Sequence, residues 1–146
     1  MLARCSACFL VAAILITGDG LVEAGKETGK VVTIKLVDSK ASQNSALAKT
    51  DTEYKGKKHK AFLVQVQKGA SYTIDVKSDD FGPKLVVVDS KGKELKLTSE
   101  SFLANGALVV FDPVAPGQMK LVVTHFGSLG DLKKNEFEMS IVEKKK

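Results

Sequence analysis

The amino-acid sequence predicts an all-β protein, a jelly-roll-like antiparallel β-sandwich of about eight strands that follows an N-terminal signal peptide. Apolar and polar residues alternate in one short segment after another, which is the period-two pattern of strands that bury one face. Turn-forming residues separate these segments at short intervals, as is typical of sandwiches. No part of the mature chain shows a convincing helical period.

The first 24 residues have the three regions of a secretory signal peptide. Arg4 supplies a positive charge, residues 5–16 (CSACFLVAAILI) form an apolar core too short to cross a bilayer comfortably, and small residues precede the expected cleavage after Ala24. A buried or anchoring N-terminal helix is the alternative. Both cysteines, Cys5 and Cys8, lie in this segment, so the mature chain would contain no disulfide. The signal predicts a secreted or periplasmic protein.

The mature chain would be basic, with all of its positive charge on lysine. Cleavage removes one arginine and two carboxylates, Arg4, Asp19 and Glu23, so the formal net charge rises from +5 to +6. Recognition of phosphates and bases favours the planar guanidinium and exposed aromatic rings, and tryptophan is absent. We therefore expect no nucleic-acid partner. A lysine-only surface indicates solubility, with diffuse attraction to polyanions as the alternative.

The mature chain divides into strands and connections. The first strand is expected in residues 31–37, and residues 38–60 form a polar connection that should contain a short strand or turn or be a mobile linker, with one helical turn at 46–48 as an option. Residues 61–97 predict four consecutive strands, of which Leu85–Val88 should be covered on both faces. Further strands are expected at 107–112, 119–124 and 136–142, with loops at 99–106 and 125–135. The residues expected to point inward are Phe62, Val64, Val66, Tyr72, Ile74, Val76, Val109, Phe111, Met119, Leu121, Val123, Phe137, Met139 and Ile141.

The strands from residue 61 onward contain a distinctive order of motifs: Tyr72-Thr73-Ile74-Asp75, Phe81-Gly82-Pro83, Asp89-Ser90-Lys91-Gly92, Pro116-Gly117 and Phe137-Glu138-Met139-Ser140-Ile141. In this order they resemble the bacterial pre-peptidase C-terminal domain. That family is a jelly-roll-like β-sandwich of secreted bacterial proteins, commonly appended to extracellular peptidases. The resemblance covers residues 54–143 and leaves residues 25–53 as an N-terminal strand and polar linker.

The resemblance assigns residues to packing and turn positions, with no catalytic signature among them. The matching inward positions and turn residues are Tyr72, Ile74, Leu85, Val87, Phe81 and Pro83. The sequence departs from the family at Gly82, where an acidic residue is usual, and at Met119, where an aromatic is usual. The acidic turn that often follows the third and fourth strands is also absent from residues 98–106. Some relatives bind calcium through acidic residues near strand ends, and these departures count against such a site here.

Carboxylates and histidines supply the candidate metal ligands. Four aspartates at expected strand ends are oxygen donors of the type that Ca²⁺ prefers: Asp79, Asp80, Asp89 and Asp112. Aspartate also favours turns for backbone reasons, and no D-x-D-x-D spacing completes a calcium loop. Two histidines, His59 and His125, are too few for a typical zinc site, and we expect both to be solvated loop residues. The sequence thus predicts no cofactor, with calcium as the alternative.

No catalytic arrangement is evident. Serines are plentiful, but none lies in a G-x-S-x-G elbow, and neither histidine has a flanking signature. We therefore expect a protein that is not an enzyme. The basic cluster at Lys55, Lys57, Lys58 and Lys60 is a candidate anion-binding site, or simply a solvated loop.

The leading functional hypothesis is a secreted, non-catalytic β-sandwich that binds an extracytoplasmic protein or polysaccharide as an accessory module. Its mature chain would contain no membrane span. One alternative is a lysine-rich envelope protein that binds anionic polymers, and another is a calcium-stabilised structural module. Salt-sensitive binding would distinguish the first alternative, and a calcium-dependent melting temperature the second.

Overall fold

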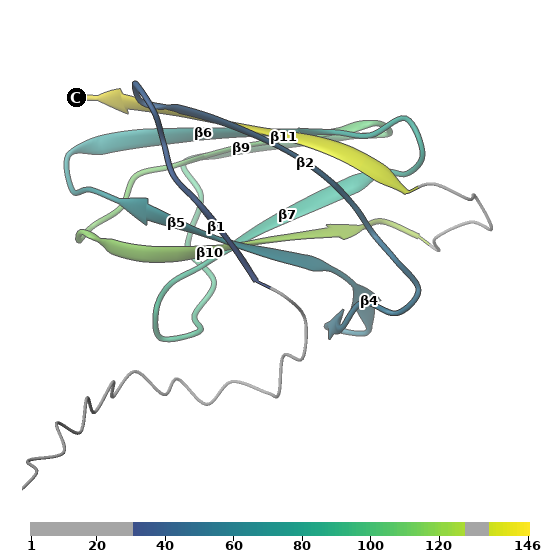
Figure 1. Ribbon diagram of the computed structural model, residues 1–146. Helices are drawn as coiled ribbons and strands as arrows, with labels where there is room; N and C mark the ends of the chain where they lie inside the picture. The colour runs from purple at the N-terminus through teal and green to yellow at the C-terminus, as the bar shows by residue number, and fades with distance from the viewer. Residues whose placement is uncertain (1–30, 128–134) are drawn as a thin grey trace, which may run out of the picture.

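The computed structural model describes residues 31–127 and 135–146. The expected signal peptide and its cleavage site lie outside the described residues. The regular secondary structure of the described part is β-strand throughout (Figure 1). Within it, no helix has the length and hydrophobicity that crossing a bilayer requires.

The strands form two layers that face one another (Figure 1). The four-stranded sheet has the order β1 (Val32–Ile34), β5 (Lys60–Val66), β10 (Gly117–His125) and β7 (Pro83–Val88). The five-stranded sheet has the order β2 (Lys40–Ala46), β11 (Glu136–Lys145), β6 (Ala70–Lys77), β9 (Gly106–Phe111) and β8 (Ser99–Leu103). A small hairpin, β3 (Glu53–Tyr54) and β4 (Lys57–Lys58), contacts β10. Only β1 and β5 pair in parallel among these strands, so the predicted antiparallel sandwich is confirmed.

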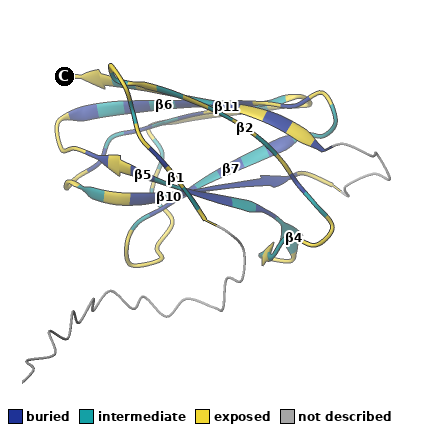
Figure 2. Ribbon diagram, in the orientation of Figure 1, coloured by how far each residue is buried: buried dark blue, intermediate teal, exposed yellow. Residues whose placement is uncertain are grey.

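The hydrophobic core lies between the two sheets and consists of the residues that the alternation placed inward. All fourteen are buried, and Tyr72, Ile74 and Val76 of the central strand β6 have no exposed surface (Figure 2). Each such side chain contributes about 1.5–3 kcal/mol through removal from water. The first and last strands of the described part both add to this core, because Ile34 of β1 and Phe137 of β11 pack into the same cluster.

Tyr72 joins the core to the rim of the sandwich. Its ring stacks on Phe111 with a centroid distance of 5.5 Å. Its hydroxyl accepts a hydrogen bond from the Gln67 backbone N–H at 2.9 Å and donates one to Glu143 Oε2 at 3.1 Å. The side chain therefore connects the turn between β5 and β6 to the end of β11. Burial, together with the Glu143 carboxylate, raises the pKa of the Tyr72 hydroxyl above its ordinary value.

Several expected connections are strands in the structure. Residues 99–106 were expected to be a loop, but residues 99–103 form β8 and pair with β9. Residues 38–60 contain β2, β3 and β4, and the optional helical turn at 46–48 is wrong because Ala46 ends β2. The inward positions of β2 are Ala41, Gln43 and Ser45, which are too small or polar to show a hydrophobic alternation. Residues 32–46 thus contribute one strand to each sheet beside the segment 54–143 that the resemblance covers.

After β7 the difference is the opposite: the sequence predicts a strand at residues 93–97, and the structure has none there. The fourth strand expected in the segment 61–97 is wrong, because residues 93–97 form only one isolated bridge, between Glu94 and Val88. The Leu95 N–H donates to the Val87 carbonyl at 2.8 Å, and the Thr98 N–H donates to the Val110 carbonyl of β9. The segment therefore crosses from one sheet to the other. Val86 is only half-buried, so the expectation that all of Leu85–Val88 is covered on both faces is also wrong.

Candidate functional site

The outer face of the five-stranded sheet is open among the described residues (Figure 1). The strand register places Val142, Thr73 and Val110 in one row across this face. The next row contains Ser140, Asp75 and Leu108. Three large hydrophobic side chains on this face are exposed, Leu103 at 65%, Leu108 at 43% and Val142 at 39%. We call this surface the outer face.

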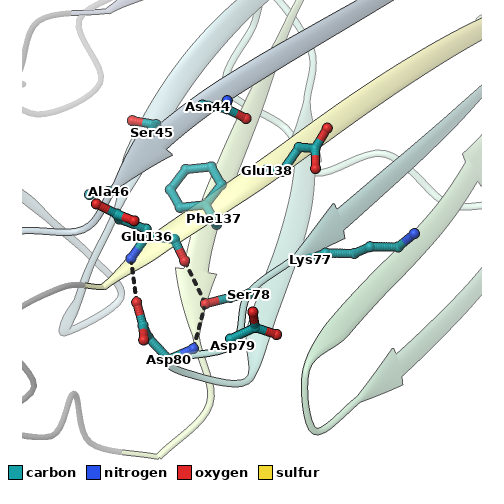
Figure 3. Close-up of a pocket in the computed structure, with 10 residues that line it drawn as sticks. All are labelled: Asn44, Ser45, Ala46, Lys77, Ser78, Asp79, Asp80, Glu136, Phe137 and Glu138. Carbon is teal, nitrogen blue, oxygen red and sulfur yellow. Dashed lines mark hydrogen bonds between the residues drawn. The ribbon is translucent and has the colours of Figure 1, made fainter.

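A groove of about 900 Å³ lies where β2 and β6 end and β11 begins (Figure 3). Its charged lining residues are four acids and one lysine: Asp79, Asp80, Glu136, Glu138 and Lys77. Two predicted calcium candidates, Asp79 and Asp80, therefore lie in one acidic groove.

Hydrogen bonds in this groove hold the turn after β6 against the start of β11. Ser78 Oγ donates to the Glu136 carbonyl at 2.6 Å and accepts from the Asp80 backbone N–H at 3.1 Å (Figure 3). Asp80 Oδ2 accepts from the Glu136 N–H at 2.9 Å. Asp80 therefore ties the start of β11 to the turn after β6, which is a structural role.

The other two calcium candidates lie at the opposite end of the sandwich. Asp89 follows β7, and its Oδ1 accepts hydrogen bonds from the Lys91 and Lys93 N–H groups, as expected of a turn aspartate. Asp112 follows β9, and the Lys146 ammonium, 2.6 Å from Asp112 Oδ2, holds the pKa of that carboxyl below its usual range. The six residues of β7 separate the two ends by about 20 Å. The structure thus brings two of the four aspartates together, and the prediction of no cofactor, with calcium as its alternative, stays a prediction.

The four candidate anion-binding lysines have partners within the protein. Lys55 pairs with Glu94 at 2.5 Å, Lys58 with Glu53 at 3.1 Å and Lys60 with Asp51 at 2.6 Å. Lys57 Nζ donates to the Gly127 carbonyl at 2.8 Å. The paired carboxylates offset much of the local positive charge, and binding of anions by these lysines stays a prediction.

A second groove, of about 660 Å³, runs beside β7. The hairpin of β3 and β4, the end of β10 and the crossing segment from Glu94 to Phe102 supply its other walls. Tyr54 Oη donates to Glu94 Oε1 at 2.5 Å, on the same carboxylate that Lys55 contacts. These two contacts, with Lys55 the stronger, lower the pKa of Glu94. We call this feature the β7 groove. Leu95 and Leu97 of this groove lie in the last part of the segment 61–97, for which the sequence predicts a strand.

Both histidines are buried, so the expectation of solvated loop residues is wrong. His59 is 3% exposed, its Nδ1 lies 3.0 Å from the Thr52 carbonyl, and its ring contacts that of Tyr54. His125 is 6% exposed because it is the last residue of β10, paired with Pro83 of β7. In the part of the chain that the structure describes, no three side chains of histidine, cysteine or acidic residues are grouped so that they could hold a metal ion.

Comparison with known proteins supports the fold. No family model and no curated protein matches the sequence. The pre-peptidase C-terminal domain of a collagenase from Bacillus anthracis is similar over 79% of this chain and 95% of that domain, with a TM-score of 0.52 and 15% identity. PliG from Aeromonas hydrophila, a periplasmic inhibitor of g-type lysozyme, is similar over 78% of this chain and 96% of that protein, with a TM-score of 0.56 and 8% identity. The resemblance seen in the sequence is confirmed at the level of the fold.

Proposed function

We propose that this chain is a non-catalytic binding module that acts outside the cytoplasm, and that its partner is a protein bound on the outer face. The observation that carries the proposal is the group of exposed apolar side chains on that face. Leu103, Leu108 and Val142 lie on one face of the sheet, with Asp75 and Lys77 between them. Exposed apolar side chains surrounded by polar residues are a feature of protein interaction sites.

The chemistry of the outer face favours a protein over a polysaccharide. Its apolar side chains lie among hydroxyl and charged residues, such as Thr73, Ser140 and Asp75, a mixture found in protein interfaces. The face carries none of the aromatic rings of the chain on its described strands. Five strands about 4.8 Å apart and β6 of eight residues give a face of roughly 600 Å². A standard interface uses about 800 Å² from each partner, so the face and its rim are sufficient.

The expected signal peptide supports a location outside the cytoplasm, and the folds that this one resembles agree with it. PliG is a periplasmic protein that inhibits another protein, so this sandwich fold can serve a protein partner. The charged surface is a weaker candidate for the binding energy, since the lysines of the β3–β4 region pair with carboxylates and a carbonyl of the same chain.

Site-specific photo-crosslinking tests the proposal. A crosslinking amino acid replaces Leu108 on the outer face, and the tagged full chain is expressed in its own cells. We expect one discrete heavier adduct that contains a second protein. A matched variant places the same amino acid at Val114, which is 84% exposed in the connection between β9 and β10. Equal adducts from both positions, or none from Leu108, would refute the outer face as the binding surface.

An assay for hydrolase activity tests whether the protein is non-catalytic. The purified protein is incubated with casein, with peptidoglycan and with nitrophenyl esters. We expect no turnover above that of heat-denatured protein. Activity that disappears after a single side-chain substitution would make the protein an enzyme.

A further inference from the structure

The β7 groove has the size and lining of a small-molecule site. Its volume of about 660 Å³ falls in the range of roughly 300–1,000 Å³ that is typical of ligand pockets. Its walls come from four separate parts of the chain, so the tertiary fold builds it. It lies between the edge strand β7 of the four-stranded sheet and the edge strand β8 of the other sheet, and Leu108 and Val142 of the outer face do not line it.

One part of the groove is apolar. Leu95, Leu97, Phe102 and Phe126 line it, and the rings of Phe102 and Phe126 meet edge to face at 5.4 Å. Phe126 is 45% exposed, so a ligand that covers this ring removes apolar surface from water. This part of the groove suits an aliphatic chain or an aromatic ring.

The rim of the groove is positive. Four lysines and two glutamates line it: Lys55, Lys57, Lys84, Lys96, Glu94 and Glu100. Lys55 and Glu94 form an ion pair, so the remaining charges leave an excess of two lysines. The Lys84 ammonium lies 5.7 Å from the centroid of the Phe126 ring. A positive charge is therefore held directly over the apolar wall.

An unsatisfied polar atom lies at the same place. His125 lines the groove, and its buried Nδ1 has no hydrogen-bond partner among the described residues. Buried side-chain nitrogens without a partner are rare, and leaving one unpaired is costly.

We propose that the β7 groove binds a small amphipathic carboxylate, with its apolar body on Phe102 and Phe126 and its carboxylate beside Lys84. The excess of two positive charges favours an anion, and Lys84 is the cation held over the apolar wall, so a single carboxylate is the matching group. A phosphate dianion would call for more converging cations and for the bidentate geometry of arginine, and Arg4 is the only arginine of the chain. This site is independent of the outer face and of its protein partner.

NMR titration of the ¹⁵N-labelled protein with 4-phenylbutyrate tests the proposal. We expect saturable shifts of the amides of Lys84, Leu97 and Phe126, and none of Leu108 or Val142 on the outer face. The neutral analogue 4-phenylbutyramide has the same body without the charge, and we expect its affinity to be about fivefold lower, the upper end of what a partly exposed ion pair contributes. Absence of shifts up to about 10 mM, well above a millimolar dissociation constant, would overturn the proposal.

Matched variants test whether Lys84 binds the carboxylate and whether Phe126 contacts the apolar body. Lys84→Gln should weaken binding of 4-phenylbutyrate about fivefold and leave binding of the amide unchanged, whereas Lys68→Gln in the turn between β5 and β6 should leave both unchanged. Phe126→Ala should weaken binding of both compounds, because they share the apolar body. Equal affinities of the acid and the amide, tighter binding of phenyl phosphate, or an equal effect of the two lysine variants would each overturn the assignment.

Discussion

Replacement of Tyr72 by phenylalanine tests how the core is joined to the rim of the sandwich. The substitution keeps the buried ring and its stacking on Phe111 and removes only the hydroxyl. Two hydrogen bonds are lost, one from the Gln67 N–H and one to the Glu143 carboxylate. A neutral hydrogen bond contributes about 1 kcal/mol net, and one to a partly exposed carboxylate about the same, so Tyr72→Phe should cost about 2 kcal/mol.

Chemical and thermal unfolding measure this cost. The described domain has about 110 residues, for which 1 kcal/mol corresponds to about 4 °C, so the melting temperature should fall by about 8 °C. Tyr54→Phe is the matched control, since its hydroxyl also donates to a glutamate, Glu94, but at an exposed site. We expect it to cost less than about 1 kcal/mol. Equal costs for the two variants would refute the reasoning.

Alkaline pH provides an independent readout of the same residue. The pKa of Tyr72 is raised in the folded protein. Its contribution to stability is therefore complete below the unfolded pKa of about 10 and is lost as the pH rises through the folded value. The wild-type protein should lose stability above pH 10 more steeply than Tyr72→Phe. Parallel profiles of unfolding free energy above pH 10 would show that this hydroxyl does not titrate as described.

The remaining predictions concern the two grooves. Lys55 and Tyr54 lower the pKa of Glu94. The ionised Glu94 therefore stabilises the folded protein above the unfolded pKa of about 4.3, and this stabilisation is lost as the pH falls through the folded value. Glu94→Gln should make the free energy of unfolding less dependent on acid pH, and an unchanged pH profile would contradict this. Ser78→Ala removes the hydroxyl that bonds Glu136 and Asp80 and should cost about 1–3 kcal/mol in urea unfolding, whereas Ser90→Ala in an exposed turn should cost less than about 0.5 kcal/mol. Calcium at millimolar concentration should leave the melting temperature within about 1 °C of that in chelator. The reason is that, among the described residues, no three histidine, cysteine or acidic side chains are grouped so that they could hold a metal ion. A larger rise that Asp79→Asn abolishes would place a calcium site in the acidic groove.

The core could be predicted from the sequence because alternation is a local property. A strand with one buried face must place apolar side chains at every second position, and β6 and β11 do so at Tyr72, Ile74, Phe137 and Met139, all buried. The strands β2 and β8 lie at the edges of their sheet, where partial exposure relaxes that requirement. β2 depends on the backbone of β11, which is distant in sequence. β8 forms a hairpin with β9 across residues 104–105, but its mostly exposed residues show no hydrophobic alternation.

The candidate sites were less predictable. Asp79 and Asp80 were singled out from turn chemistry, and the structure places them in one groove, but it places Asp89 and Asp112 at the other end. The buried His125 illustrates the same limit, because its burial follows from its pairing with Pro83. Which polar residues of different strands meet depends on strand order, and the sequence contains no local signal of that order.

The sequence by itself determined the all-β class, the inward face of each central strand and the turns that separate the strands, since these depend on residues within a few positions of each other. Only the tertiary structure decided which strands are neighbours, which sheet face remains open and how the β7 groove assembles. Those features depend on contacts between residues such as Tyr54, Lys84, Glu94 and Phe126, far apart along the chain. Packing of the two sheets selects these contacts, because it buries the apolar faces of all central strands at once.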